Sequence, residues 1–196
     1  MGLRTPIEIM AGVIRPRPWA GWALALTLLA PASRPASASH AQHPPEVEFS
    51  CPGTARFSPH GGAEALVIDT LAQARVSVHI AIYGLTSRKI EQALLDLAQS
   101  GVRVFIKADH VQSAGKTQAT LLSRLRAAGI EVEVSRVGRL LHDKFVIVDG
   151  RWVVTGSFNW TEGAERRNRE NVLALDCPAL ARAFEAEWET IRPDDP

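Results

Sequence analysis

Four polar side chains near the end of the sequence could act together on a phosphate group. His142 supplies an imidazole, which can attack phosphorus when its second ring nitrogen is hydrogen-bonded. Lys144 offers a cation to the non-bridging oxygens as charge develops on them. Ser157 and Asn159 add neutral hydrogen-bond donors. These residue types indicate phosphodiester chemistry with histidine as the nucleophile, provided that the fold brings them together.

A predicted β-hairpin would bring them together. Lys144–Val148 and Arg151–Thr155 are apolar runs separated by Asp149-Gly150 alone, a strong signal for a two-residue type I′ turn. Side chains two residues apart share one face of a sheet, and directly opposed Cβ atoms lie about 5 Å apart. The spacing therefore predicts one polar row on the hairpin: His142, Lys144, Thr155 and Ser157, continued by Asn159.

The opposite face of the same hairpin is predicted to be apolar. Phe145, Ile147, Trp152 and Val154 alternate with the polar row and are typical of a core. Asp149 falls in the turn itself, so we interpret it as a structural residue of the hairpin and not as an acid or base.

The elements that precede the hairpin alternate between strands and helices. Short β-branched runs are interleaved with stretches of helical periodicity, which predicts βαβ units. The fold class is therefore α/β, a three-layer α-β-α sandwich around a mixed, mostly parallel sheet with a C-terminal hairpin. The expected strands are 46–50, 75–83, 102–108, 130–134, 144–148, 151–155 and 171–175, and the expected helices begin near 65, 87, 117 and 179.

The first 38 residues have the composition of a signal peptide. Arginines precede an apolar run from Trp19 to Ala30, and Ala36-Ser37-Ala38 supplies the small residues of a cleavage site. An uncleaved anchor is the alternative. We expect residues 1–38 to be the signal, 39–45 a flexible segment, 46–192 one domain and 193–196 a tail. The protein would then be exported, either periplasmic or secreted.

Loss of the signal changes the charge balance. Of the 22 basic and 21 acidic residues, four basic and one acidic lie in 1–38, so that 18 basic and 20 acidic remain. A strong global field for polyanions is therefore absent, and binding would depend on a local patch. Arg151 and Arg166 are interpreted as merely exposed. The candidate patch comprises Arg136, Arg139, Lys144, Arg151, Arg166, Arg167 and Arg169.

Cys51 and Cys177 are the two cysteines of the chain. Two cysteines in an exported protein favour one disulfide, with two buried thiols as the alternative. Their spacing and the distribution of histidines show no metal-binding motif.

The combined motif resembles the HKD signature of the phospholipase D superfamily. The resemblance rests on His142-x-Lys144-x4-Asp149, then Gly156-Ser157-x-Asn159, then Asn168-Arg169-Glu170-Asn171. It is most similar to the short, single-motif bacterial endonuclease branch, to which Phe57-Ser58-Pro59, Ala81-Ile82-Tyr83 and Gly101-Val102-Arg103-Val104 also correspond. The match covers almost all of the chain after the signal.

The resemblance implies a role for each residue. His142 would form a covalent phosphohistidine, Lys144 and Asn159 would bind the phosphate, and Glu170 would orient His142 through its other ring nitrogen. The alternative for Glu170 is a surface ion pair with a neighbouring arginine. Ser157 would support the phosphate or simply satisfy backbone groups.

One histidine does not complete the reaction, because in-line displacement also needs a proton donor for the leaving oxygen. Larger family members carry two motifs, whereas this chain has one. We therefore expect a homodimer with the active site at the two-fold interface. No metal and no cofactor are expected, since paired lysines and polar donors would neutralise the phosphate.

Three functions remain open from the sequence. The first is a nonspecific nuclease that cleaves DNA, with RNA as a further candidate substrate. The second is a phospholipase D-type lipid phosphodiesterase, which should expose an apolar rim or an interfacial helix, and the sequence shows no convincing one. The third is a non-catalytic module that binds nucleic acid or lipid, which would not need a histidine paired with a carboxylate.

Overall fold

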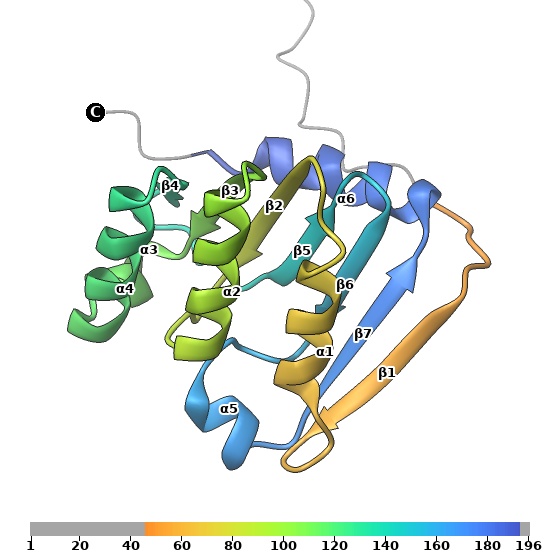
Figure 1. Cartoon of the computed structure of the whole chain (residues 1–196), viewed down its shortest axis with the longest axis horizontal. Helices are drawn as coiled ribbons and strands as arrows, with labels where there is room; N and C mark the ends of the chain where they lie inside the picture. Colours follow the sequence, from red (N-terminus) through yellow and green to blue (C-terminus); the bar gives the residue numbers. More distant parts are fainter. Residues whose placement is uncertain (1–45, 193–196) are drawn as a thin grey trace, which may run out of the picture. The chain divides into compact units, whose positions relative to one another are not determined.

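A seven-stranded mixed sheet organises the part of the chain that the structure describes, residues 46–192 of a computed structural model (Figure 1). The strand order is β1-β7-β6-β5-β2-β3-β4. The strands are β1 (Gly53–Ser58), β2 (Ser77–Ile82), β3 (Arg103–Ala108), β4 (Glu131–Val134), β5 (Lys144–Val148), β6 (Trp152–Gly156) and β7 (Glu170–Asp176). The helices are α1 (Ala63–Leu71), α2 (Arg88–Gln99), α3 (His110–Ala114), α4 (Lys116–Ala127), α5 (Glu162–Arg166) and α6 (Pro178–Thr190).

The pairing directions divide the sheet into two halves. β2, β3 and β4 pair in parallel, each linked to the next by helices, as expected for βαβ units. The neighbours from β2 through β5, β6 and β7 to β1 pair antiparallel. The α/β class and the mixed sheet are confirmed, but the described sheet has more antiparallel than parallel pairs. The reason is that β5 and β6 join by a hairpin, and a short connection cannot make a parallel crossover.

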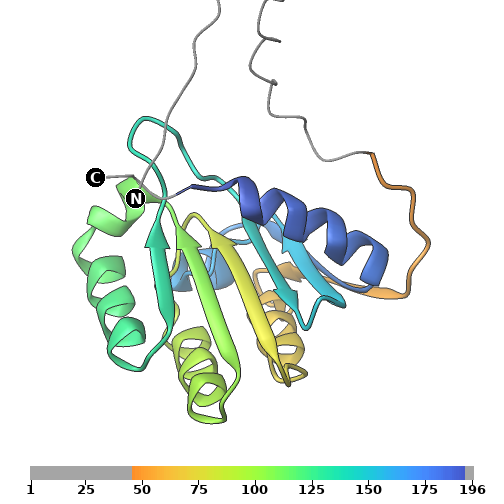
Figure 2. The same cartoon turned by 90° about the horizontal axis from the view of Figure 1, so that it is seen from above.

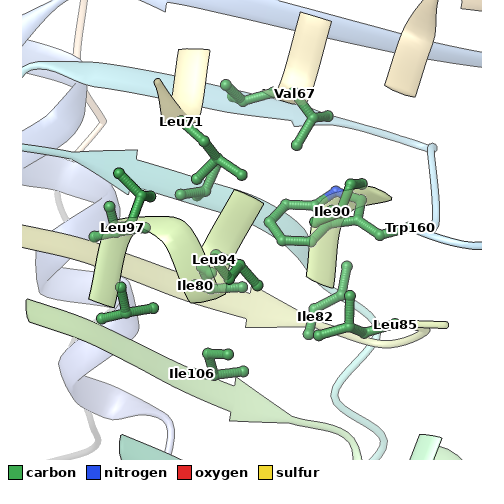
Figure 3. Close-up of a cluster of buried hydrophobic side chains, with 14 of the residues drawn as sticks. Val67, Leu71, Ile80, Ile82, Leu85, Ile90, Leu94, Leu97, Ile106 and Trp160 are labelled. Carbon is green, nitrogen blue, oxygen red and sulfur yellow. The ribbon is translucent and has the colours of Figure 1, made fainter. Parts of the chain in front are cut away.

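Apolar packing covers both faces of the sheet, which gives the expected three layers. α1, α2 and α4 pack on one face and α6 on the other, as the edge-on view shows (Figure 2). The larger core lies under α1 and α2, where Leu71, Ile90 and Leu94 meet Ile80 and Ile106 of the sheet (Figure 3). These side chains are at most 1% exposed. This core fixes the positions of β2 and β3 in the sheet.

Some predicted elements lie elsewhere. The strand expected at 46–50 is irregular chain, and the first strand is β1, which includes Phe57. β1 is an exposed edge strand, so its hydrophobic pattern is weak. The short helices α3 and α5 were not predicted. Each begins at a side-chain cap, Asp109 for α3 and Thr161 for α5, rather than at a periodic apolar stripe.

The hairpin forms at the predicted place with a different register. Asp149 and Gly150 both have positive φ, and the Arg151 amide donates to the Val148 carbonyl, as in the predicted turn. However, Val148 pairs with Trp152 rather than with Arg151. Arg151 is drawn away because its carbonyl accepts from the Cys177 amide. The loop therefore holds three residues, and every pair in the hairpin is shifted by one.

Because of the register shift, the predicted polar row is wrong at Thr155. Thr155 pairs with Phe145 and not with Lys144, and both line a cavity against α6. The predicted apolar row divides as well: Phe145 and Ile147 pack toward α6, whereas Val154 packs in the α1–α2 core with Trp152 against it. Both faces of the hairpin are apolar along most of their length.

Asp149 anchors the turn to the start of β2. Its carboxylate accepts hydrogen bonds from the backbone amides of Arg75, Val76 and Ser77 at 2.8, 2.8 and 2.9 Å. Partial burial opposes the charge of this carboxylate, but the three amides outweigh burial and lower the pKa of Asp149. The residue lies at the end of β5 remote from Lys144, so its contacts are structural.

A disulfide joins Cys51 to Cys177, as predicted. It connects the segment before β1 to the N-terminus of α6, across 126 residues of sequence. No helix within 46–192 is long and apolar enough to cross a membrane. The predicted signal peptide, the segment 39–45 and the tail 193–196 lie outside the described residues.

Removal of the disulfide should destabilise the fold without changing the site. We expect a Cys51→Ala/Cys177→Ala variant to lose about 2 to 4 kcal/mol of unfolding free energy, because the bridge restricts the unfolded chain. Urea denaturation of the variant and of the oxidised and reduced wild type measures the loss. Equal midpoints for oxidised and reduced wild type would contradict this prediction.

Candidate active site

Four strand ends meet at one edge of the sheet. β2 and β6 end there, and β5 and β7 begin there, because β5 runs antiparallel to both of its neighbours and β7 runs antiparallel to β6. Lys144 at the start of β5 pairs with Ile82 at the end of β2. This arrangement places residues that are up to ninety positions apart in sequence around one point.

His142 and Lys144 both contact the ring of Tyr83, the residue after β2. The His142 and Tyr83 ring centroids lie 4.7 Å apart, and the Lys144 Nζ lies 5.0 Å from the Tyr83 centroid. The Lys144 Nζ also donates to the His142 carbonyl. His142 is exposed, whereas Lys144 is 8% exposed. An accessible imidazole therefore lies beside a buried ammonium.

The ammonium of Lys144 lies in a partly desolvated position. Burial lowers the pKa of Lys144 below its ordinary value, and the carboxylates of Asp143, Glu170 and Asp109 oppose the shift. Burial also raises the pKa of Asp143, although the nearby charges of Lys144 and His142 act to lower it. A cation with few water contacts interacts strongly with an anion that enters the site.

Asp109 holds the segment that leads to His142. This fully buried residue follows β3, and its carboxylate accepts from the Leu141 amide at 3.1 Å and the Gln112 amide at 2.9 Å. The Gln112 side chain in turn donates to the Tyr83 hydroxyl at 2.9 Å. Asp109 and Tyr83 were not predicted as site residues. Their position, at the end of one predicted strand for Tyr83 and directly after another for Asp109, was the available signal.

Glu170 belongs to a separate hydrogen-bonded group at the start of β7. Its two oxygens accept from the Ser157 hydroxyl at 2.6 Å and the Asn168 side-chain amide at 3.0 Å. Glu170 is near enough to Lys144 to influence its pKa, so the group borders the site. The carboxylate is occupied by Ser157 and Asn168 here, and its predicted orientation of His142 stays a prediction.

Ser157 reaches Glu170 because the strand turns aside at Gly156. A Cβ at Gly156 would lie 2.2 Å from the Asn171 carbonyl, so only glycine permits this approach of β7. The Ser157 amide donates to that carbonyl at 3.1 Å. The predicted grouping of Ser157 with the site therefore depends on this local turn and not on a continued strand.

Asn159 lies against Gly84, the residue after Tyr83. A Cβ on Gly84 would lie 3.4 Å from the Asn159 Oδ1. This buried oxygen has no hydrogen-bond partner among the described residues. Buried polar atoms are nearly always paired, so the unpaired Asn159 Oδ1 is typical of a position that water or substrate completes.

Four residues outside the predicted catalytic set have structural contacts. Arg151 pairs with Asp176 at the remote end of β6, so it does not contribute to a patch at the site, and Arg166 forms an exposed ion pair with Glu162 of α5. His79 lies under α6, with its Nδ1 2.6 Å from Glu185. Trp160 is a core residue, 2% exposed.

An apolar rim that the sequence did not predict borders the site. Val111 of α3 and Val137 and Leu140 of the loop before His142 are 53%, 66% and 61% exposed. α3 and this loop adjoin, since the His110 amide donates to the Ser135 hydroxyl. The same loop carries Arg136 and Arg139, which line a cavity of about 340 Å³ with Arg192, Asp143 and Glu187.

Within residues 46–192 no three histidine, cysteine, aspartate or glutamate side chains are grouped as a metal site. The chemical groups that the site does offer are an imidazole, an ammonium, an amide and a carboxylate.

Comparison with known proteins gives a family match over most of the described chain. A family described as cardiolipin synthase, PLD-like domain, matches residues 67–192. The crystal structure of a phospholipase D family member, Nuc from Salmonella typhimurium, is 30% identical with a TM-score of 0.70. The match covers 75% of this chain and 100% of that one.

Curated relatives bear lipid-directed names. A phospholipase D of Rickettsia bellii is 36% identical over 132 residues, which are 67% of this chain and 65% of that protein. A mitochondrial cardiolipin hydrolase of Chlamydomonas reinhardtii is 36% identical over 124 residues, 63% of this chain and 55% of that protein. The matched region is thus slightly less than two thirds of the first relative's length.

The depressed pKa of Lys144 can be measured directly. We expect the Lys144 ammonium to titrate below the ordinary value of 10.5, and Glu170→Gln to lower the pKa further, because one opposing carboxylate is lost. NMR titration with labelled lysine measures both shifts. Glu162→Gln, an exposed carboxylate change on α5, is the control. A rise in the Lys144 pKa in Glu170→Gln would contradict the described arrangement.

Proposed function

The chain belongs to the phospholipase D superfamily, and on that premise we propose that it is an exported phosphodiesterase that hydrolyses nucleic acid, most readily DNA, through a phosphohistidine at His142. The observation that carries the proposal is the exposed imidazole of His142 beside the buried ammonium of Lys144, both against Tyr83. A histidine in this setting is open to a substrate, and the buried cation stabilises charge on the attacked phosphate.

The proposed reaction has two displacements. A ring nitrogen of His142 attacks phosphorus, the bond from phosphorus to the leaving oxygen breaks, and that oxygen takes a proton from a second imidazole. Water deprotonated by the same imidazole then attacks the phosphohistidine and releases His142. Lys144 and the Asn159 amide bind the non-bridging oxygens. Glu170 would move from Ser157 or Asn168 to reach His142 when the site is occupied.

A second copy of the chain supplies the second imidazole in this proposal. The edge that carries His142 would lie at a two-fold axis, opposite the partner subunit's His142. The exposed apolar rim of Val111, Val137 and Leu140 supports this arrangement, since a second copy at this edge would remove those side chains from water.

Export is supported by the disulfide. A bridge between Cys51 and Cys177 is compatible with an oxidising compartment, periplasmic or extracellular, and rare in a reducing one. The signal-like composition of residues 1–38 agrees with this proposal.

Nucleic acid is the proposed substrate because the short single-motif pattern is most similar to the endonuclease branch. The Nuc structure, that of a phospholipase D family member, matches over its whole length, which supports the single-motif architecture. A lipid phosphodiesterase is the second candidate. The apolar rim favours it, because such side chains beside an active site could enter a membrane surface, and the curated relatives carry the names phospholipase D and cardiolipin hydrolase.

The substrate assignment is tested by parallel assays. We expect the purified protein to cleave plasmid DNA in excess chelator and to leave phosphatidylcholine and cardiolipin vesicles intact. His142→Ala should lower kcat on the order of 10⁴- to 10⁶-fold, as for other lost nucleophiles. Acid-quenched protein should yield a phosphorylated His142 peptide. Vesicle hydrolysis without DNA cleavage would establish the lipid candidate, and binding without turnover of either would indicate a non-catalytic module.

The shared site is tested by subunit mixing. Excess His142→Ala protein, after subunit exchange, should suppress wild-type activity, because a mixed dimer lacks one of the two imidazoles. Excess Arg182→Ala, which changes an exposed α6 residue, should not. Sedimentation velocity should show a dimer, and a fully active monomer would overturn this part of the proposal.

A further inference from the structure

A basic pocket lies beside the candidate active site, between α2 and α4. Its volume is about 200 Å³. It is lined by Thr86, Arg88, Lys116, Thr117, Thr120, Leu121 and Arg124. No carboxylate lines it. The neighbouring pocket that shares Thr86 and Arg88 is different, because its other charged lining residues are Glu64, Glu162, Glu165, Lys89 and Arg166.

Short hydrogen-bonded connections link this pocket to the active site. Thr86 is three residues after Tyr83, and its amide donates to the carbonyl of Trp160, the residue after Asn159. Gln118, in the first turn of α4, accepts from the Leu85 amide at 2.7 Å and donates to the Tyr83 carbonyl at 3.3 Å. These bonds fix the position of the pocket relative to Tyr83.

The Arg124 guanidinium is held in place by the Glu91 carboxylate before any ligand arrives, whereas Arg88 makes one longer contact to the same carboxylate. The buried carboxylate of Glu91 accepts from Arg124 at 2.5 and 2.9 Å and from Arg88 at 3.3 Å. Glu91 neutralises one of the three cations around the pocket and does not line it. Lys116 has no ion pair within residues 46–192, so its charge is available. The pocket retains an excess of positive charge.

The remaining wall is suited to oxygen anions. Thr86, Thr117 and Thr120 contribute hydroxyl groups, and α4 begins at Gly115 without a side-chain cap on its amides. Hydroxyl donors combined with guanidinium groups and an ammonium match the geometry of a phosphate better than that of a carboxylate-rich or apolar ligand.

We propose that this pocket binds a second phosphate of the nucleic acid strand whose scissile phosphate lies at His142 and Lys144, an inference that rests on the proposed function. Three residues of chain span at most about 10 Å, so Thr86 lies within that reach of Tyr83. A strand rises about 3.4 Å per nucleotide, so a phosphate a few nucleotides away fits this separation. A lipid with a single phosphodiester has no group for the pocket, whereas cardiolipin has two phosphates.

The test compares a long and a minimal substrate. In the full chain, Lys116→Ala should raise the KM for a single-stranded oligonucleotide severalfold. It should leave kcat/KM for bis(p-nitrophenyl) phosphate, which has one phosphodiester, unchanged. In a His142→Ala background, the negative slope of log K against log salt should become less steep in Lys116→Ala by about 0.7, the value for one phosphate contact on a single strand. Lys116→Arg should restore both values.

Arg182→Ala is the matched control, because it removes one exposed positive charge from α6 on the opposite face of the sheet. Equal effects of Lys116→Ala and Arg182→Ala would overturn the subsite, as would a parallel loss on both substrates. If the wild type cleaves DNA and the salt slope is unchanged in Lys116→Ala, the subsite fails and the proposed function stands. If it neither binds nor cleaves DNA but hydrolyses cardiolipin vesicles, both proposals fail.

Discussion

The antiparallel pairing of β5 with its two neighbours is the constraint on which the candidate site depends. In a wholly parallel sheet, the start of one strand lies at the opposite edge from the end of the next. Because β5 runs against β2 and β6, Lys144 at its start contacts Tyr83 after the end of β2, and Ser157 follows the end of β6 at the same edge. The segment that leads to His142 is held to this junction by the buried carboxylate of Asp109, which accepts from the Leu141 and Gln112 amides.

The residue types and the local turn were predictable from the sequence, but the register was not. The Asp149-Gly150 turn formed with the expected positive φ values, yet Arg151 turned toward Cys177 and moved every following pair by one position. That interaction joins residues 26 positions apart, so no local pattern contains it. For the same reason Thr155 was wrongly placed, while Ser157 reached Glu170 through a break in the strand at Gly156.

Tyr83 and Asp109 illustrate a second limit. Both follow strands whose own pattern was read correctly, and both owe their importance to a segment much later in the chain. Local sequence patterns predict a strand, but they do not predict which distant segment will pack against the end of that strand. The apolar rim was missed similarly, since three scattered residues become a surface only when α3 and the loop before His142 adjoin.

The position of Asp149 gives a physical meaning to the length of the motif that begins at His142. Lys144 faces the substrate edge, and Asp149 grips the amides that start β2 at the opposite edge. The four residues between them form the rest of β5. Their number therefore reflects the length of this strand and not a distance between reacting groups. If β5 were one residue longer or shorter, either Lys144 would leave the candidate site or Asp149 would lose the amides at the start of β2. The spacing of the motif is therefore set by the scaffold.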